Sequence, residues 1–516
     1  MLSSAEGFEY TPTEGLKAGL PTPAVINPHE LNASTAETYD VIVIGAGYAG
    51  LITARDLTSQ GRKVLLIEGR DRIGGRTWTS YTDGHAYEMG GTWIHWHQPH
   101  LWTEVTRYGL NNQIKDSLEM YPESAPQSTY TGGSRKDWSL AEITAMQEKS
   151  AATFLAIDGK HPTEWLPYPH NPSYNRANYV KYDRMSVQDR LDQLDGVLSE
   201  EEMAFTKANL GALAGIDFAQ ISLFDIVQRW LLCGTTQEEY MNHMARYKLK
   251  CGQTGLARCI FDDACSTGKL SYSFSNSLKA INSSDPRRAT VTCADGRMFS
   301  ARQVVCTIPL TVLRSVSFFP ELPPLKAEAI AKAKSNPIRK LHVQVGGKQW
   351  KSWAGAKFAE EELVMVMGES HSPSGKDTNL VAFHDGANIG DPRIKAKELV
   401  KYFEGLHPDM KVKRFKQPAA SSSVCACLIV FADYTGSPFS NGGWCVFQPD
   451  YMSKYLEALQ EPVGNVKFAS GDYSDGWRGF IDGAIEGGII AARAVERDLR
   501  SPPRHPKLAR SSRPSL

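Results

Sequence analysis

Three glycines stand at the spacing of a loop that lets main chain approach phosphate groups. In the run VIVIGAGYAG, Gly45, Gly47 and Gly50 form G-x-G-x-x-G between a predicted strand and a predicted helix. Gly45 permits the tight turn, Gly47 allows close approach to a pyrophosphate, and Gly50 lets helix and strand pack together. The helix N-terminus offers free N–H groups and the positive end of its dipole. The motif predicts a dinucleotide-binding site.

Glu68 is a further residue whose type and position suggest a chemical role. It ends the next predicted strand, eighteen residues after Gly50. A carboxylate at this place accepts both hydroxyl hydrogens of an adenosine ribose and disfavours a 2′-phosphate. The glycines and Glu68 together do not separate FAD from NAD.

The elements that position these residues form a β-α-β unit. Residues 40–44 are a short apolar run typical of a buried strand, and residues 49–60 are helix-like. Gly61 can cap that helix, and residues 63–68 form a second apolar strand.

The rest of the chain predicts two interleaved domains. Residues 116–250 are polar and helix-like, which indicates an inserted second domain, whereas 289–307 return to strands around a turn at Asp295 and Gly296. The end of the chain predicts a strand, a loop and a helix. The expected division is a leader at 1–38 draped over the body, a nucleotide-binding domain at 39–115, 251–330 and 461–500, a substrate-binding domain at 116–250 and 331–460, and a disordered tail at 501–516.

The composition is that of a globular protein with no global charge. Fifty-seven basic residues balance fifty-seven acidic ones, which disfavours binding to nucleic acid or to an anionic membrane. No apolar run reaches the roughly 18 residues of a membrane-spanning helix, and MLSSAEGFEY lacks the features of a signal peptide. We therefore expect a soluble intracellular protein whose nine cysteines are reduced.

Two groups of residues raise the question of a metal. Cys425 and Cys427 form C-x-C, but no second pair stands at zinc-ligand spacing. His95 and His97 would share one face of a strand, with His100 nearby. We interpret the histidines as packing and hydrogen-bonding groups and expect no metal.

The motifs together resemble the flavin monoamine oxidase family. After the fingerprint and Glu68, the runs RIGGR (72–76) and EMGGTW (88–93) are similar to its FAD-binding half, and FASGDYSDGWRGFIDGAIEGG (468–488) to its last flavin segment. The likeness covers nearly the whole chain. The runs GFEYTPTEGL and MGGTWIHWHQPH most resemble soluble monoamine oxidases of filamentous fungi. The implied fold is α/β, with a Rossmann-like FAD-binding domain and a discontinuous α+β substrate-binding domain, as in amine oxidases and p-hydroxybenzoate hydroxylase.

The resemblance implies FAD as cofactor. Arg76 would neutralise pyrophosphate charge, Asp472 would contact the polar chain of FAD, and the helix beginning at Ile481 would face the N1/C2 edge of the flavin. Gly443 stands where the mammalian mitochondrial enzymes carry the cysteine that bonds to flavin, so we expect non-covalent FAD. The implied cofactor-binding residues are Gly45, Gly47, Ala49, Gly50, Glu68, Arg70, Gly75, Arg76, Gly90, Gly91, Thr92, Trp93, Gly471, Asp472, Phe480 and Ile481.

Three residues carry the catalytic roles that the family implies. Trp444 and Phe480 occupy the positions of an aromatic pair before the flavin, where apolar ring faces steer the amine and favour its neutral form. Many relatives have tyrosine at both positions, which leaves the substrate range open. Lys340 matches the lysine that holds a water near flavin N5 and assists reaction with oxygen.

The expected activity is an amine:oxygen oxidoreductase acting on monoamines. Hydride passes to flavin N5, the imine hydrolyses to an aldehyde or ketone, and O₂ becomes H₂O₂. Polyamine oxidase and L-amino-acid oxidase are alternatives, and a flavin-free binding protein similar to the Rab GDP-dissociation inhibitors is the non-enzyme alternative. The C-terminal Pro-Ser-Leu loosely resembles a peroxisomal address, so we expect peroxisome or cytosol and leave a homo-oligomer open.

Overall fold

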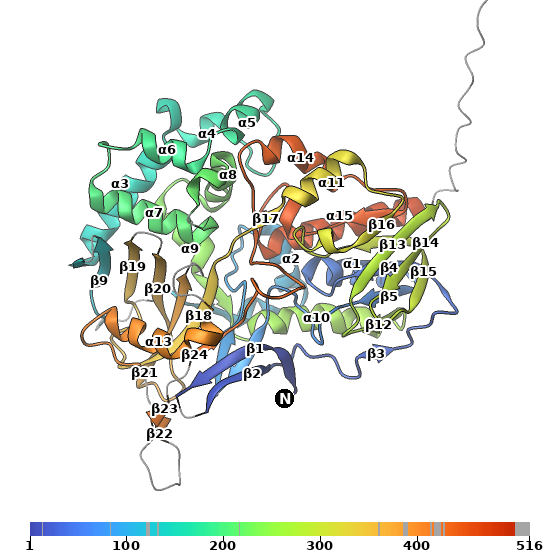
Figure 1. The fold of residues 1–516 in the computed structure, drawn as a ribbon, viewed down its shortest axis with the longest axis horizontal. Coiled ribbons are helices and arrows are strands. Elements are labelled where there is room, and N and C mark those ends of the chain that lie inside the picture. Colours follow the sequence, from blue (N-terminus) through green and yellow to red (C-terminus); the bar gives the residue numbers. More distant parts are fainter. Residues whose placement is uncertain are drawn as a thin grey trace, which may run out of the picture.

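The computed structural model describes most of the chain as two sheet-based parts joined by helices (Figure 1). The described residues are 1–12, 14–82, 84–119, 124–131, 134–215, 217–359, 362–384, 391–412, 415–416, 425–426 and 429–500. Cys427, the tail at 501–516 and its Pro-Ser-Leu lie outside the described residues.

The predicted β-α-β unit is confirmed. Strand β4 (Thr38–Ile44) leads into α1 (Tyr48–Ser59), which is followed by β5 (Val64–Ile67). The two strands are parallel, with Val41 opposite Val64. Gly61 has a φ of +81°, a left-handed conformation that suits glycine after a helix.

The first sheet contains the nucleotide-binding motif. Its strand order is β16-β13-β14-β15-β4-β5-β12-β3, and β26 pairs with β15. The predicted ribbon around Asp295 and Gly296 is the hairpin of β14 and β15, which leads into the sheet beside β4. Its strands are β3 Glu30–Leu31, β4 Thr38–Ile44, β5 Val64–Ile67, β12 Leu270–Ser273, β13 Leu278–Asp285, β14 Arg288–Cys293, β15 Met298–Cys306, β16 Ser317–Phe319 and β26 Val466–Phe468.

The second sheet lies beside the first and takes strands from both ends of the chain. Its order is β10-β9-β19-β20-β21-β18-β24-β1-β2. Its strands are β1 Ser3–Thr11, β2 Gly15–Pro21, β9 Gln127–Thr131, β10 Ser134–Trp138, β18 Arg339–Gly346, β19 Ala354–Ala359, β20 Glu362–His371, β21 Asp377–His384 and β24 Ile429–Phe431. Four small pairs complete the strands: β6 Thr79–Thr82 with β7 His85–Glu88, β8 Ile114–Asp116 with β11 Tyr247–Leu249, β17 Lys334–Ser335 with β25 Cys445–Val446, and β22 Phe415–Lys416 with β23 Cys425–Ala426.

The leader forms regular strands that enter both sheets. Strand β1 pairs with β24 of the second sheet, and β3 pairs with β12 of the first. The Pro-rich composition of residues 1–38 does not predict these strands. Strand β1 forms a hairpin with β2, but its other partner, β24, and the partner of β3, β12, lie hundreds of residues away.

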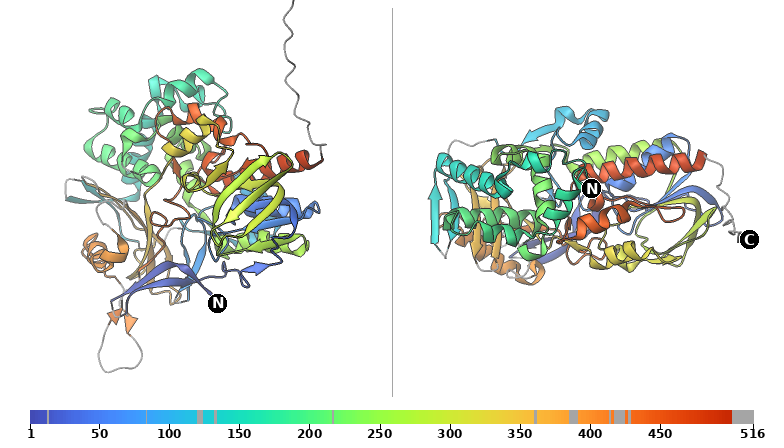
Figure 2. Two further views of the ribbon diagram at one scale, coloured as in Figure 1. Left: turned by 45° about the vertical axis from the view of Figure 1, so that its right-hand side comes forward. Right: turned by 90° about the horizontal axis from the view of Figure 1, so that it is seen from above.

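Helices cover both faces of the first sheet (Figure 2). The helices α1, α10 and α15 lie on one face, and the helical segment between α3 and α9 stands above the second sheet. The helices are α1 Tyr48–Ser59, α2 Pro99–Arg107, α3 Leu140–Leu155, α4 Pro162–Trp165, α5 Arg176–Asp183, α6 Val187–Gln193, α7 Glu200–Ala214, α8 Leu223–Cys233, α9 Gln237–Ala245, α10 Gly252–Ser266, α11 Pro324–Lys332, α13 Pro392–Gly405, α14 Tyr451–Gln460 and α15 Ile481–Arg500.

The alternation of side chains along β4 divides the core. Val41 and Val43 pack in the cluster that includes α1, α10 and α15, whereas Ile42 and Ile44 pack in the cluster of the opposite face. A parallel strand buried on both faces is apolar throughout, which is why residues 41–44 are all aliphatic. Among the described residues, no helix combines the length and apolar character that crossing a bilayer requires.

Candidate active site

A cavity of about 450 Å³ runs between the two sheets, and most of the predicted site residues line it. It is lined by the glycine loop at one end and by residues of the second sheet and α7–α9 at the other. The predicted residues that line it are Gly45, Gly47, Ala49, Glu68, Arg70, Gly75, Arg76, Gly90, Gly91, Thr92, Trp93, Lys340, Gly443, Trp444, Gly471, Phe480 and Ile481.

The N-terminus of α1 provides an anion site at the nucleotide end. Gly47 is the N-cap residue, no side chain caps the helix, and the first turn holds no acidic residue. Free N–H groups therefore face the cavity, as a pyrophosphate requires. Gly45 has a φ of +102°. A Cβ on Gly50 would lie 1.8 Å from the carbonyl oxygen of Gly45, which agrees with its predicted packing role although Gly50 does not line the cavity.

Glu68 is held in place by the main chain around it. One carboxylate oxygen accepts the N–H of Ala46 at 2.6 Å and the other accepts the N–H of Arg70 at 2.8 Å. Each oxygen retains a further lone pair for a ribose hydroxyl. The carboxylate is thus fixed beside the loop where the sequence places the adenosine ribose.

Asp472 differs from the sequence expectation. It is buried, and it is not among the described residues that line the cavity. One of its oxygens pairs with Arg76 Nη1 at 2.8 Å, and the other accepts the N–H of Leu310. Arg76 also donates to the carbonyl of Gly443 at 2.7 Å. In this structure Asp472 contacts Arg76, which itself lines the cavity.

Lys340 connects β18 to the loop that follows β7. Its Nζ donates to the carbonyl of Gly90 at 3.0 Å and to the hydroxyl of Thr92, and it lies 5.3 Å from the ring of Trp93. Burial lowers the pKa of Lys340 from the ordinary value of a lysine, although Glu369 and Glu88 partly oppose this effect. The ammonium group is thereby placed at the end of the cavity opposite the glycine loop.

The predicted aromatic pair lines the same end of the cavity. Trp444 is oriented by a hydrogen bond from Nε1 to the carbonyl of Leu213 at 2.6 Å. Phe480 stands edge-on to Trp477 at 5.1 Å, directly before α15. Gly479, directly before Phe480, has a φ of +86°, and a Cβ there would lie 3.3 Å from the guanidinium group of Arg229 and 3.4 Å from Trp444. The cavity wall here is aromatic and rigid.

The rest of this end is apolar and comes from elements that carry no sequence motif. Trp93 and Phe383 stand 6.0 Å apart on one side. The remaining apolar residues of this part are Leu213, Met241, Met244, Ile338, Met365 and Met367. Sequence reasoning missed them because methionines and leucines on helices and strands are indistinguishable from ordinary core residues until the fold brings them together.

Arg229 also lines the cavity, and it shares one carboxylate with a second arginine. Its Nη2 donates to Asp225 and to the carbonyl of Cys445, both at 2.8 Å. Asp225 binds Arg478 as well, at 2.6 Å. Although burial opposes ionisation, the two arginines lower the pKa of Asp225. Arg229 is therefore held in a buried cluster with Asp225 and Arg478.

His95 and His97 meet a residue that the sequence does not single out. His97 Nδ1 lies 3.1 Å from His243 Nδ1, and His95 Nδ1 accepts the N–H of His97 at 3.1 Å. Burial lowers the pKa of His95 to about 3, so that ring is neutral near pH 7. His100 is not part of this group. None of the four histidines lines the cavity within the part of the chain that the structure describes.

The arrangement defines a flavin-dependent oxidoreductase. Anion-binding N–H groups and a ribose-binding carboxylate lie at one end, and an apolar chamber with a buried lysine lies at the other. The residues of this cavity fit FAD. The main chain of Gly47 and that of Gly75 lie so close together that a Cβ on Gly75 would come within 3.2 Å of Gly47 Cα, so this wall carries no side chain that would keep a pyrophosphate away. No cysteine or histidine is among the described residues that line the cavity, which agrees with non-covalent FAD.

Comparison with known proteins identifies the family. Residues 48–496 match the model of the flavin containing amine oxidoreductases. The chain is 30% identical over 466 residues to pseudooxynicotine dehydrogenase of Pseudomonas sp, which covers 87% of this chain and 84% of that protein. It is 28% identical over 468 residues to nicotine dehydrogenase of Pseudomonas putida, with 89% of each chain covered. Cyclohexylamine oxidase from Brevibacterium oxydans IH-35A has a similar structure, with a TM-score of 0.69, 21% identity, and coverage of 90% of this chain and all of that one.

The chain belongs to the flavin-containing amine oxidoreductase family. It is an FAD-dependent enzyme that oxidises amines, and the predicted fold, family and cofactor are confirmed. The match over most of the chain argues against a flavin-free binding protein. The closer likeness to fungal enzymes and the individual site roles stay predictions.

Proposed function

We propose that this enzyme oxidises apolar monoamines and transfers the electrons to O₂. The observation that carries the proposal is the lining of the chamber around Lys340, Trp444 and Phe480, which is mostly methionine, leucine, isoleucine and aromatic side chains, with Asn209 and Arg229 as polar members. Apolar lining excludes water, so it favours the neutral form of the amine whose lone pair assists the reaction. Bound FAD supplies the hydride acceptor.

A second charge on the substrate is disfavoured. Glu68 is the only carboxylate residue among the described lining residues, and it belongs to the nucleotide end. A polyamine would bury an ammonium group with no partner, which is costly. An amino acid would need a cation for its carboxylate, and the Nη2 of Arg229 is held by Asp225 and by the carbonyl of Cys445. The chamber therefore fits an amine with an apolar substituent better than either alternative.

The electron acceptor needs its own argument, since two similar proteins are named as dehydrogenases and one as an oxidase. Lys340 supports oxygen as the acceptor in this chain. Its buried ammonium group lies in the chamber and stabilises negative charge that develops as O₂ is reduced.

Hexylamine and 1,6-diaminohexane form a matched test of the substrate class. They have the same length, and only the diamine carries a second ammonium group. We expect kcat/KM for hexylamine to be about a hundredfold higher, because burial of an unpaired charge costs several kcal/mol. L-norleucine tests the amino-acid alternative. Equal or better turnover of the diamine or of L-norleucine would contradict the proposal.

Peroxide yield tests the acceptor. An oxidase produces one H₂O₂ per amine consumed, and anaerobically reduced enzyme reoxidises when oxygenated buffer is added. Reoxidation by an artificial acceptor alone, with no peroxide, would show a dehydrogenase.

Two further expectations remain proposals. The sheets support a division into an FAD-binding part at 39–115, 251–330 and 461–500 and a substrate-binding part at 116–250 and 331–460.

Residence in the peroxisome or cytosol rests on the terminal Pro-Ser-Leu alone, and imaging of the tagged full chain with and without these residues tests it.

A further inference from the structure

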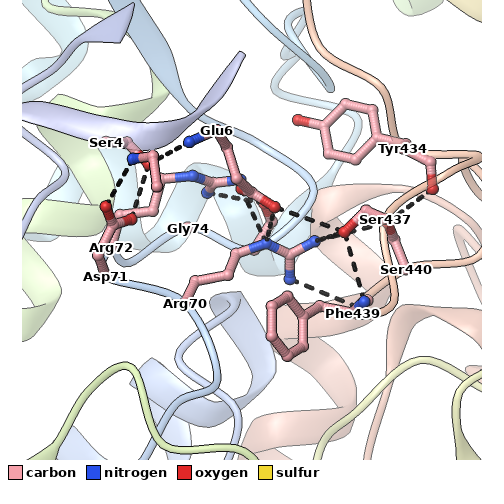
Figure 3. A network of polar contacts seen from close by, with 12 residues as sticks. Ser4, Glu6, Arg70, Asp71, Arg72, Gly74, Tyr434, Ser437, Phe439 and Ser440 are labelled. Atoms are coloured by element: carbon pink, nitrogen blue, oxygen red, sulfur yellow. Dashed lines mark hydrogen bonds and ion pairs between the residues drawn. The ribbon is translucent and has the colours of Figure 1, made fainter. Parts of the chain in front are cut away.

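Glu6, in the leader strand β1, binds two arginines beside the nucleotide end of the cavity (Figure 3). Its Oε1 lies 2.8 Å from Arg70 Nε, and its Oε2 pairs with Arg72 Nη2. The side chains of Arg70 and Arg72 are nearly inaccessible to solvent, at 4% and 0% exposed. The ion pairs join residues more than 60 positions apart in the sequence.

A bulge in the leader hairpin aims Glu6 at these arginines. The register of β1 against β2 shifts between Ser4 and Phe8, so the intervening residues leave the regular ladder. Gly7 in the bulge has a φ of +84°, and a Cβ there would lie 2.5 Å from the side chain of Leu20. Bulges characteristically redirect a side chain out of the sheet pattern.

The residue between the arginines is tied to the same strand. Asp71 accepts the hydroxyl of Ser4 at 2.7 Å and the N–H of Ala5 at 2.8 Å. The leader therefore contacts three consecutive residues of the loop after β5, residues 70–72. This loop runs directly from Glu68 to the Gly74–Gly75 turn.

Each arginine in turn shapes the cavity. Arg70 lines it, lies 5.2 Å above the ring of Phe439 and donates to Ser437. Arg72 does not line it, but its Nη1 donates to the carbonyl of Gly75 at 2.9 Å, and Gly75 faces Gly47 of the pyrophosphate loop. Arg70 thus forms part of the wall itself, and Arg72 supports the wall through the carbonyl of Gly75.

Glu6 supplies the charge that keeps the arginines together. Among the described residues, it is the one carboxylate that forms an ion pair with either of them. Burial opposes its ionisation, but Arg72 and Arg70 lower the pKa of Glu6 to about 2. Without Glu6, two buried like charges would repel each other with no compensation.

We infer that Glu6 is a positioning residue for FAD, through which the N-terminal strand locks the cofactor into the cavity. It does not touch the cofactor itself. It fixes Arg70 and the Gly74–Gly75 turn so that the nucleotide end is closed around the bound FAD. The inference depends on FAD binding and not on which amine is oxidised.

The test compares flavin release from purified holoenzyme of the wild type and of Glu6→Gln, which keeps the shape and removes the charge. Release is followed as the rise in free-flavin fluorescence after dilution, without any amine. We expect Glu6→Gln to release FAD at least about tenfold faster. The increase in Tm that added FAD gives to the apoprotein should also be smaller in the variant, since a looser ligand stabilises less.

Glu14→Gln is the matched control in the same hairpin. Glu14 pairs with Lys17 at 2.7 Å on the surface, with 41% of its side chain exposed. This variant should retain FAD as the wild type does. The inference would be overturned if Glu6→Gln released FAD at the wild-type rate, if apoprotein and holoenzyme lost stability equally, or if Glu14→Gln released FAD equally fast.

Discussion

At the residue scale, Lys340 has two predicted roles, one that depends on its hydrogen bonds and one that depends on its charge. Its hydrogen bonds to Gly90 and Thr92 hold the loop that the family places against the flavin, and its charge faces the chamber. Removal of the charge should therefore affect the reaction with oxygen, whereas removal of the hydrogen bonds should affect the loop.

Lys340→Met removes the charge together with the hydrogen bonds to Gly90 and Thr92, and it keeps most of the volume. We expect reoxidation by O₂ to slow on the order of tenfold to a hundredfold. Stopped-flow measurement of the two half-reactions separates this effect from slower reduction by the amine. Unchanged rates in both half-reactions would remove Lys340 from the mechanism.

The same residue predicts a pH dependence. Because burial lowers the pKa of Lys340, the ammonium form is lost at a lower pH than for an exposed lysine. The rate of reoxidation should therefore fall on the alkaline side well below pH 10.5, the ordinary value for lysine. Lys340→Met should show no such alkaline fall, and a fall retained in the variant would assign it to another group.

At the scale of elements, two glycines at the start of helix α1 have different predicted roles: Gly47 in cofactor binding and Gly50 in packing. A Cβ on Gly47 would have no neighbour closer than 3.9 Å, and the residue has a φ of −74° that any residue adopts. A Cβ on Gly50 would overlap the carbonyl of Gly45. Alanine should therefore weaken FAD binding at Gly47 and disturb the packing of the helix at Gly50.

Gly47→Ala should keep the Tm of the apoprotein near that of the wild type and weaken FAD binding, because only the approach of phosphate is blocked. Gly50→Ala should lower the stability of the apoprotein by about 2 kcal/mol or more, since helix and loop must separate. Thermal unfolding of both apoproteins and titration with FAD check the pair. Equal behaviour of the two variants would contradict the assignment.

Helix α15 carries a buried acid that predicts a pH-dependent stability. Asp482 accepts the N–H of Leu101 at 2.8 Å, and burial raises its pKa to about 7. The unfolded chain ionises this group near pH 3.8. Stability from this group is therefore lost as the pH rises from about 4 to 7 and stays low above that range.

Asp482→Asn keeps the acceptor oxygen and cannot ionise. The variant should be more stable than the wild type at pH 8, on the order of a few kcal/mol, with no difference near pH 4. Denaturant unfolding at both pH values measures this. Asp262→Asn, an exposed residue on α10, is the control. A variant that is less stable than the wild type at pH 8 would show that the ionised carboxylate of Asp482 stabilises the fold and that its pKa is not raised.

Local elements could be predicted from the sequence, and the chamber could not. The strand, helix and glycine turn around Gly45 follow from short-range preferences, and so does the helix that begins at Ile481. The pairing of β1 with β24 and the gathering of the methionines in the chamber depend on contacts between distant segments. The resemblance assigns Asp472 to the polar chain of FAD, and the structure places its oxygens on Arg76 and Leu310, partners that the local sequence does not predict.

At the scale of the whole molecule, the cavity exists because two sheets from interleaved segments face each other. The glycine loop belongs to the first sheet and Lys340 to the second, so neither part alone can hold the cofactor and the substrate. The leader strands join both sheets, which makes the N-terminus part of this assembly.

Non-covalent FAD is a property of the assembled cavity. The described lining contains no cysteine, and Gly443 occupies the place before Trp444. Acid precipitation should therefore leave all flavin in the supernatant. Flavin that stays on the washed precipitate would contradict this expectation.

The central claim is that bound FAD in this chain accepts hydride from an apolar monoamine. The most direct measurement is the visible spectrum of the purified protein before and after anaerobic addition of hexylamine. The account predicts a flavin band that the amine bleaches and that oxygen restores. A protein without flavin that takes up none, or a bound flavin that hexylamine and other apolar monoamines leave oxidised, would contradict it.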